Sequence, residues 1–342
     1  MSSETTQMRQ EINEIPFAVD RLLTDGATAI TKTASAIRAH DPGFLISVAR
    51  GSSDHACSYL KYASELLLGL PMASVGPSVK SIYGVDMRCP GALCISVSQS
   101  GQSPDIVQLT KSLTEGGAYS VAITNDTTSA LAQNATSALP ILAGPELSVA
   151  ATKTFVTSLV AGLWLLAEVK GDDTLLAAIH KLPEDLSRAI TCDWSAVVEA
   201  VDGQSLFTLG RGMSWAISNE AALKFKETCQ IHAESYSSAE VLHGPVSIVD
   251  QGFPVIAFSS GDAAEANIAE VADALAAKGA KVFATTNQVS DAVRLPHVRT
   301  THWMTDPVAS IASFYGMVET VAKRLGINPD APRHLRKVTE TV

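Results

Sequence analysis

The amino-acid sequence predicts an α/β protein built from two tandem, doubly wound parallel-sheet domains. The first observation behind this prediction is length, because 342 residues at roughly 100 to 200 residues per domain correspond to about two domains. The second is that short apolar runs alternate with segments of helical spacing, and this order requires right-handed crossovers between parallel strands. The third is that one such unit occurs twice in the chain.

The repeat is visible as two pairs of matching segments. In the first pair, "FLISVARGSSDHACSYLKYASEL" and "LFTLGRGMSWAISNEAALKFKE" both consist of an apolar strand, an Arg-Gly turn and a helix. In the second pair, Gly101 corresponds to Gly261. The two segments of each pair are about 160 positions apart in the chain. A nearly constant offset indicates a duplicated unit. The matching segments are 44–66 with 206–227, and 92–125 with 253–287.

The elements are expected in a simple order along the chain. The opening stretch "MRQEINEIPFAVDRLLTDGATAITKTASAIRAH" has helix caps and apolar spacing but no strand. The stretch between the two repeats also reads as helical, and the chain ends in a tail with two prolines and basic residues. The predicted boundaries are 1–36 for the N-terminal helical segment, 37–169 for the first domain, 170–204 for the helical linker, 205–326 for the second domain and 327–342 for the C-terminal tail.

Composition excludes several classes of function. A net charge of −10 without a Lys/Arg cluster argues against a nucleic-acid or membrane surface, since such binding rests on neutralising phosphates. The N-terminus is polar and acidic, and no apolar run approaches about 18 residues, so we expect a cytoplasmic protein. The five cysteines show no C-x-x-C spacing and the histidines no H-x-x-x-H pair, which predicts neither a disulfide framework nor a metal site.

The stretch "SVSQSGQSPD" (96–105) is the first candidate binding site. It lies between an apolar strand and a helix, at the sheet edge where helix N-termini favour anions. Gly101 allows close approach of the backbone, and the side chains predicted to bind a phosphate are those of Ser98, Gln99, Ser100 and Ser103. The alternative is that a serine here only caps the helix. The matching turn "SSGDAAEAN" carries Asp262 and Glu265, so only the first copy is expected to bind phosphate.

The second candidate site is a helix in the second repeat. Glu220, Lys224 and Glu227 fall at i, i+4 and i+7, so one helix face presents acid, amine and acid together. The alternative is a solvated face with an ordinary Glu-to-Lys pair. His243 in "VLHGP" and Lys337 in "LRKVTETV" would by default be a structural turn histidine and a solvated tail lysine.

Five segments together resemble one known family. In this order, "ARGSSDHA", "SVSQSGQSPD", "ELSVAATKTF", "NEAALKFKETCQIHAESYSSAEVLHGP" and "LRKVTETV" are similar to the sugar isomerase (SIS) domains of glucosamine-6-phosphate synthases. The resemblance runs from about residue 40 to residue 342 and implies flavodoxin-like SIS domains. Ser103 stands where the family has Thr, which keeps the hydroxyl, and Ala151 stands where the family commonly has Ser, so a polar contact is missing there.

The resemblance also implies a role for each candidate residue. The family binds its sugar phosphate with side chains and one backbone group, which in this chain correspond to Ser53, Ser98, Gln99, Ser100, Ser103, Val149 and Glu220. Lys224 and Glu227 coincide with a catalytic pair of the family. The matching histidine, His243, enters the active site of a neighbouring subunit and helps to open the sugar ring, which implies a homodimer with shared sites. The matching lysine, Lys337, folds over the sugar and faces its carbonyl.

These groups suit a proton shift between carbons 1 and 2 of a sugar phosphate. The reaction needs a ring opener with a pKa near neutral, for which histidine is suited, and a carboxylate that moves the proton. It also needs a cation to stabilise the enediol-like charge. His243, Glu227 and either Lys224 or Lys337 fill these roles. No metal or organic cofactor is expected.

The reaction class depends on what accompanies the SIS domains. Synthases carry an N-terminal glutaminase with a cysteine nucleophile at residue 2, where this chain has Ser, and residues 1–36 leave no room for such a domain. The expected reaction is therefore that of stand-alone two-SIS deaminases, which convert glucosamine 6-phosphate to fructose 6-phosphate and ammonia. The enzymatic alternatives are a deglycase of phosphorylated Amadori compounds and a plain aldose/ketose isomerase. A sugar-phosphate sensor is the non-enzymatic alternative, disfavoured because the N-terminal segment lacks a basic recognition helix.

Overall fold

The computed structural model describes residues 5–337 of the chain. Residues 338–342 of the expected tail and residues 1–4 of the expected N-terminal segment lie outside the described residues. The chain forms two compact units, here named after their sheets. Of the described residues, the first-sheet unit comprises Phe17–Glu146, Lys153–His180 and 336–337. The second-sheet unit comprises 5–16, Leu147–Thr152 and Lys181–Leu335.

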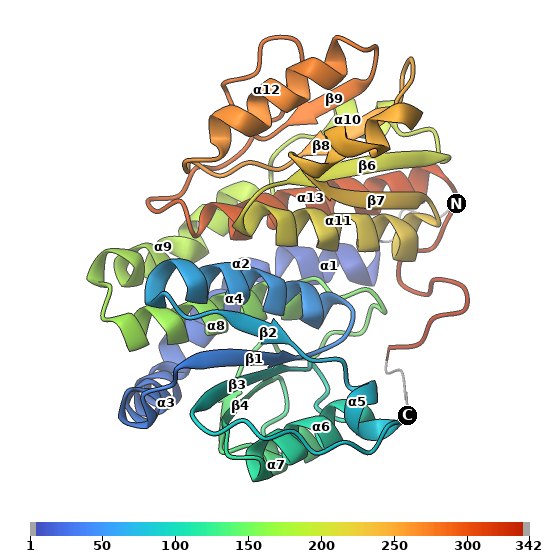
Figure 1. Cartoon of the computed structure of the whole chain (residues 1–342). Coiled ribbons are helices and arrows are strands. Elements are labelled where there is room, and N and C mark those ends of the chain that lie inside the picture. The colour runs from blue at the N-terminus through green and yellow to red at the C-terminus, as the bar shows by residue number, and fades with distance from the viewer. Residues whose placement is uncertain (1–4, 338–342) are drawn as a thin grey trace. The chain divides into compact units, whose positions relative to one another are not determined.

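The first sheet has five parallel strands in the order β2-β1-β3-β4-β5 (Figure 1). Its central strand is buried at all six positions, "ALCISV", as expected of a parallel strand covered on both faces. In register, Leu45 of β1 pairs with Leu93 of β3. The strands are β1 (Phe44–Val48), β2 (Met72–Ser74), β3 (Ala92–Val97), β4 (Tyr119–Thr124) and β5 (Ser137–Pro140).

Helices cover both faces of this sheet. Helices α3 and α4 pack on α8, while α6 packs on α5 and α7. The stretch from Lys153 to Ala167 of α8 is buried, so this helix is an interior element rather than an amphipathic one. The helices from α2 to α9 are α2 (Ile15–Asp25), α3 (Ala27–His40), α4 (Ser52–Leu68), α5 (Ser78–Ser81), α6 (Pro104–Glu115), α7 (Ala130–Asn134), α8 (Lys153–Lys170) and α9 (Asp173–Ala189).

The second sheet repeats this arrangement. Its order is β10-β9-β8-β6-β7, all parallel, which read from β7 is the order of the first sheet. The strands are β6 (Ser205–Gly210), β7 (His232–Ser237), β8 (Pro254–Ala257), β9 (Lys281–Ala284) and β10 (Val293–Arg294).

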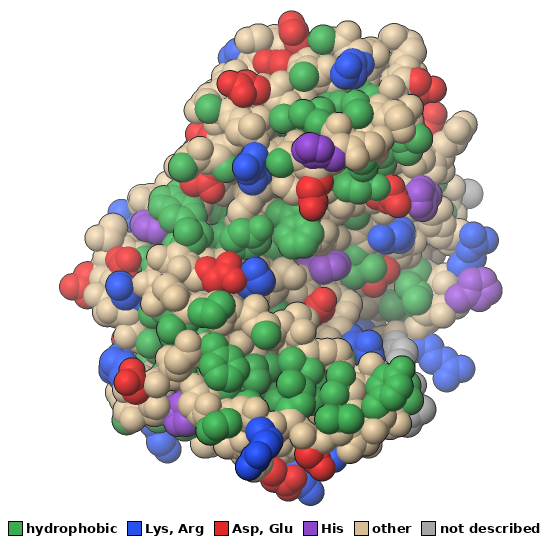
Figure 2. Space-filling model, in the orientation of Figure 1, with side chains coloured by type: hydrophobic (Ala, Val, Ile, Leu, Met, Phe, Trp, Pro, Cys, Tyr) green, Lys and Arg blue, Asp and Glu red, His purple; other side chains and the backbone are tan. Residues whose placement is uncertain are grey.

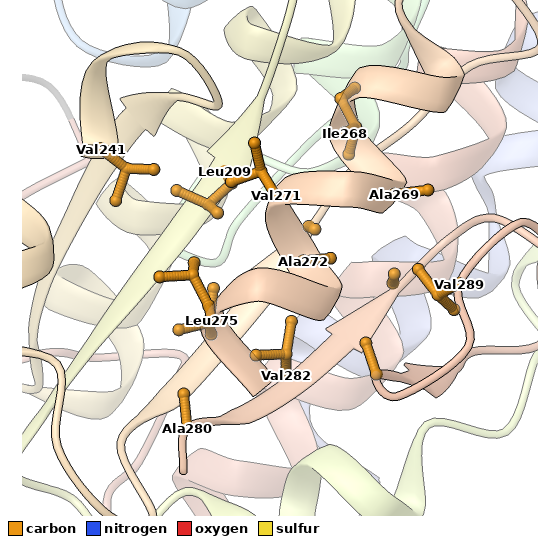
Figure 3. Packing of buried hydrophobic residues seen from close by; sticks show 14 of the residues in the cluster. Leu209, Val241, Ile268, Ala269, Val271, Ala272, Leu275, Ala280, Val282 and Val289 are labelled. Carbon is orange, nitrogen blue, oxygen red and sulfur yellow. The ribbon is translucent and has the colours of Figure 1, made fainter. Parts of the chain in front are cut away.

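The second-sheet unit holds a further set of helices. They are α1 (Gln7–Asn13), α10 (Ser195–Ala200), α11 (Met213–Cys229), α12 (Glu265–Ala276), α13 (Asp306–Arg324) and the 3₁₀ turns η1 (Glu240–His243) and η2 (Pro245–Ile248). The apolar residues of α12 recur at helical spacing and pack in one buried cluster with strand residues (Figure 3). Ile268, Val271 and Leu275 of α12 share this cluster with Leu209 of β6 and Val282 of β9.

The predicted fold class, two tandem doubly wound parallel-sheet domains, is confirmed. The expected N-terminal helical segment is present as three helices, with breaks at Glu14 and Gly26. Pro16 is the second residue of α2, where its missing N–H would have no partner within the helix. Among the described helices, none combines the length and apolarity that crossing a bilayer requires. On the face drawn in Figure 2, basic side chains are scattered among acidic ones and form no basic stripe.

Candidate active site

The predicted phosphate loop lies at the switch point of the first sheet. In the strand order β2-β1-β3-β4-β5 the connections leave β1 and β3 in opposite directions, and such a point is where open α/β sheets bind ligands. The turn after β1 and the loop after β3 are tied together there. The guanidinium of Arg50 donates to the buried carboxylate of Asp105 with Nε and Nη2 both 2.8 Å from Oδ2. Ser53 lies beside Arg50, in the first turn of α4.

The hydroxyls of the loop have protons to offer to a ligand. Ser98 Oγ accepts from the Gly101 N–H at 3.2 Å, and Ser100 Oγ accepts from the Gln102 N–H at 3.3 Å. A hydroxyl that accepts these bonds keeps its own O–H as a donor. Ser103 is the N-cap residue of α6 but makes no side-chain capping bond among the described residues. Capping therefore does not occupy the hydroxyl of Ser103.

Two backbone features fix the shape of this loop. Gly101 has a φ of 62°, and a Cβ placed on it would lie 2.1 Å from Ser129 Oγ, so no other residue fits without displacing its neighbours. The Gln99 carbonyl accepts from the Asn125 N–H at 3.1 Å and from Thr124 Oγ1 at 3.3 Å, which anchors the loop to the end of β4.

Lys337 is held by an acid that the sequence analysis missed. Lys337 Nζ lies 2.7 Å from Oε2 of Glu146, whose side chain has no exposed area. Glu146 also accepts from Thr154, through the N–H at 3.1 Å and Oγ1 at 2.6 Å. Burial raises the pKa of Glu146, but the charge of Lys337 and these hydrogen bonds outweigh burial and leave this pKa below its usual value. The sequence offered one indication of a buried acid here, which was a single glutamate in the apolar stretch "ILAGPELSVA".

The three charged residues predicted to share a helix face do meet, in the second-sheet unit. Glu220 and Lys224 of α11 have no exposed side-chain area, and Lys224 Nζ lies 3.4 Å from Glu220 Oε1. Lys224 also donates to Oε2 of Glu227. Tyr315 of α13 places its hydroxyl 3.5 Å from Glu220 Oε1. The alternative of a solvated helix face is therefore wrong for Glu220 and Lys224.

Neighbouring carboxylates decide the protonation state of Lys224. Burial lowers the pKa of Lys224, but the Coulomb attraction and hydrogen bonds of Glu220 and Glu227 outweigh burial and raise this pKa above its ordinary value. Lys224 is thus an ammonium at neutral pH and cannot act as a neutral base or nucleophile. A fixed ammonium is the kind of group that stabilises a developing negative charge.

Glu227 connects this buried pair to an open hollow. Its side chain is 23% exposed, whereas that of Lys224 is fully buried. The hollow has a volume of about 460 Å³, within the range of small-molecule sites. Its described lining consists of Leu223, Lys226, Glu227, Gln230, Ile231, His232, Arg333, His334 and Leu335.

Of the predicted site residues, Glu227 alone is among the described residues that line this hollow, and His243 and Val149 lie elsewhere in the same unit. His243 is not among its lining residues and is exposed at the end of η1, where its neighbour Leu242 is 46% exposed. Val149 is half-buried and donates its N–H to the carbonyl of Asp330 at 3.4 Å. Among the described residues no group of three or more His, Cys, Asp or Glu is arranged to hold a metal ion.

The switch point of the second sheet is filled by the chain's own side chains. The Gly261 N–H donates to the carboxylate Oδ2 of Asp306 at 2.8 Å, whereas the matching Gly101 N–H donates to the neutral hydroxyl of Ser98. Arg299 lies 2.5 Å from Glu265 and 3.5 Å from Asp306. Sequence reasoning identified Asp262 and Glu265 here but missed Arg299 and Asp306, which are distant in the chain.

Comparison with known proteins gives the family. The family model for the SIS domain matches residues 41–168 and again residues 201–322. The glutamine–fructose-6-phosphate aminotransferase (isomerizing) of Sulfolobus acidocaldarius is 31% identical over 351 aligned positions, which cover 96% of this chain and 56% of that protein. The chain therefore spans about half the length of the curated relatives it matches.

Solved structures agree with this assignment. A protein from Silicibacter pomeroyi DSS-3, provisionally named a phosphosugar isomerase, is 60% identical with a TM-score of 0.93, covering 95% of this chain and 100% of that one. The glucosamine-6-phosphate deaminase of Thermotoga maritima has a TM-score of 0.76 over 98% of this chain and 100% of that one, and its 18% identity shows a common fold alone. With two matching domains on two sheets of the same strand order, this chain belongs to the SIS domain family.

Proposed function

We propose that this chain is a sugar-phosphate isomerising enzyme, and more finely that it converts glucosamine 6-phosphate into fructose 6-phosphate and ammonia. The observation that carries the proposal is Glu227, a carboxylate bonded to a buried ammonium on one side and open to a hollow on the other. Carbon-to-carbon proton transfer needs such a base, held in place and partly shielded from water.

The two units have separate tasks in this proposal. The domain at 37–169 binds the phosphate through the hydroxyls of Ser98, Ser100 and Ser103, with Gln99 and Ser53 beside them. The domain at 205–326 carries out the proton transfer, and Val149 contacts the sugar with its backbone. The fixed loop conformation at Gly101 and the uncommitted hydroxyl of Ser103 support the first assignment.

The chemical steps balance without a cofactor. His243 assists ring opening, which exposes the carbon 1 aldehyde. Glu227 removes the proton from carbon 2, and the ammonium of Lys224 stabilises the charge that forms. Glu227 returns the proton to carbon 1, the carbon 1 oxygen gains a proton and the nitrogen loses one, which leaves a hydroxyl at carbon 1 and an imine at carbon 2. Water then adds to the imine, and ammonia leaves. In this proposal Lys337 faces the sugar carbonyl, and Glu220 keeps Lys224 charged.

An amino sugar is the favoured substrate because the relatives that are about 30% identical bear the name of an enzyme that installs an amino group on fructose 6-phosphate. Water is the abundant nucleophile for the imine, so the proposed reaction releases ammonia. A plain aldose/ketose isomerase is the second candidate, favoured by the provisional name of the 60% identical structure. It would use the same proton transfer without nitrogen chemistry.

One experiment tests both candidates. The chain is incubated with glucosamine 6-phosphate in deuterated water, while ammonia, fructose 6-phosphate and exchange at carbon 2 are followed by NMR. Glu227→Gln keeps side-chain size but removes the base, so kcat should fall by roughly 10² to 10⁴ and exchange should stop together with ammonia release. Glu270→Gln, an exposed change on α12, is the control. Exchange at the wild-type rate in Glu227→Gln would show that another residue is the base.

A panel of substrates separates the reaction classes. Fructosamine 6-phosphate and unaminated hexose 6-phosphates are assayed beside glucosamine 6-phosphate. Turnover of the unaminated sugars alone would replace the deaminase by a plain isomerase, and turnover of the fructosamine alone would replace it by a deglycase. Tight binding of all of them with turnover of none would indicate a sensor.

The proposal includes a homodimer with shared active sites. His243 is exposed on a turn flanked by Leu242 and Ile248, which are 46% and 55% exposed, as expected of a segment that a second copy covers. Mixing inactive His243→Ala chains with inactive Glu227→Gln chains should restore activity in hybrid dimers. No recovery despite measured subunit exchange would contradict shared sites.

A further inference from the structure

The geometry points to Glu11 as a positioning residue for the loop formed by residues 147–149, hereafter the Val149 loop. This inference rests on the proposed function, in which the Val149 backbone contacts the sugar. Glu11 lies on the short helix α1, more than 130 positions away in the sequence, and both segments belong to the second-sheet unit. Neither family motifs nor spacing pointed to it.

The carboxylate of Glu11 is committed to the Val149 loop. The Glu11 residue is only 3% exposed, and it accepts three hydrogen bonds from the loop. Oε1 receives the N–H of Leu147 and, at 3.2 Å, the N–H of Ser148, while Oε2 receives the hydroxyl of Ser148. Hydrogen bonds to an ionised group are the strong ones, so this side chain fixes the path of the loop just before Val149.

A second contact fixes the loop on its other side. The carboxylate of Asp330 accepts from the backbone N–H groups of Gln7 and Met8, at 2.9 and 2.8 Å, at the start of α1. The carbonyl of the same Asp330 accepts from the Val149 N–H at 3.4 Å. Helix α1 therefore joins the Val149 loop to the C-terminal segment that leads toward Lys337.

Helix α1 has further anchors besides Glu11. Arg9 donates to the buried carboxylate of Glu319 on α13, with Nη2 2.5 Å from Oε2, and to the carbonyl of Gly316 at 2.6 Å. Thr6 adds a bond to Glu319 at 2.8 Å. Removing the charge of Glu11 should therefore release the loop but leave the helix docked. This separation makes a positioning role distinguishable from a structural one.

The consequence is a selective loss of sugar binding. A displaced Val149 backbone weakens contact with the sugar in ground state and transition state alike, so KM should rise while kcat changes little. Phosphate is bound by a different loop, so affinity for inorganic phosphate should not change. We expect about a tenfold rise in KM for Glu11→Gln and less than about a threefold change in kcat.

The experiment compares Glu11→Gln with Asp20→Asn, which removes one negative charge from an exposed position on α2. Dissociation constants for fructose 6-phosphate and for inorganic phosphate are measured by calorimetry. The values of kcat and KM are measured in steady-state assays with glucosamine 6-phosphate as substrate. The expected result for Glu11→Gln is about tenfold weaker fructose 6-phosphate binding with phosphate binding unchanged. Unchanged sugar binding, or equal loss of sugar and phosphate binding, would overturn the inference.

Two features of the design keep the test decisive. If the wild type releases no ammonia, the proposed function fails, yet the ratio of the two dissociation constants still tests Glu11. If Glu11→Gln does not fold, Ser148→Ala removes only the hydroxyl donor and should shift the same ratio in the same direction by a smaller factor. A ratio equal to that of the wild type in Ser148→Ala would then count against the role of Glu11.

Discussion

Replacing Lys224 by Met tests whether the buried ammonium of α11 is there to neutralise buried carboxylates. Met fills nearly the same space without charge. The change leaves the fully buried carboxylate of Glu220 without the cation 3.4 Å away. Glu227, which is 23% exposed, can be stabilised by water instead. The cost should therefore come almost entirely from Glu220.

The magnitude follows from this burial. Removing one partner of a buried ion pair costs about 3 to 5 kcal/mol, because the remaining charge stays uncompensated. Lys224 and Glu220 are both 0% exposed, so the full range applies. The double variant Glu220→Gln with Lys224→Met buries no charge at that position. It should recover most of this loss, to within about 2 kcal/mol of the wild type.

The assay must follow one unit of a two-unit protein, since a single unfolding transition cannot be assumed for both. Three of the four tryptophans, Trp194, Trp215 and Trp303, lie in the second-sheet unit. In a Trp164→Phe background, tryptophan fluorescence during urea unfolding therefore reports on that unit alone. The reasoning is refuted if Lys224→Met costs less than about 1 kcal/mol, or if the double variant is as unstable as the single one.

Three further predictions concern the same two sites. Gly101→Ala should raise the KM for sugar phosphate at least about tenfold in steady-state assays, because φ is 62° and Ser129 blocks a Cβ. Ser103→Ala should raise KM without lowering the thermal midpoint, because its hydroxyl makes no capping bond among the described residues. The pKa of Lys224 is raised above the ordinary value of 10.5, so the stability that its charge adds is complete below that value and is lost as pH rises above it. The urea midpoints of wild type and Lys224→Met should therefore converge in alkali.

The fold could be predicted because its signals are local or repeated. Alternation of strands and helices identifies a parallel sheet, and the duplicated order predicts that the second domain copies the first. The spacing of Glu220, Lys224 and Glu227 on one helix face is likewise fixed by 3.6 residues per turn. Whether that face is buried was not predictable, since burial depends on α13 and Tyr315, about 90 positions further on.

The missing parts of the site are acids whose partners are remote in sequence. Glu146 pairs with Lys337, and Glu11 with residues 147 and 148, so no periodicity or motif links either acid to its partner. For Glu146 the available signal was a single acid in an apolar stretch, which is also the signal of a surface residue, and for Glu11 there was none. The three bonds to Glu11 and the ion pair of Glu146 exist only once the chain has folded.

The two switch points show how one duplicated frame can serve two purposes. After β3, the loop offers hydroxyls to a ligand, and the positive φ of Gly101 sets the path of its backbone. After β8, the corresponding amide of Gly261 donates to the carboxylate of Asp306 and not to a neutral hydroxyl as Gly101 does, and Arg299 is held by Glu265. A phosphate entering there would have to displace one carboxylate and approach another, and like charges at such distances repel strongly in a buried site. The side chains therefore favour phosphate at the first sheet, although strand order is the same in both.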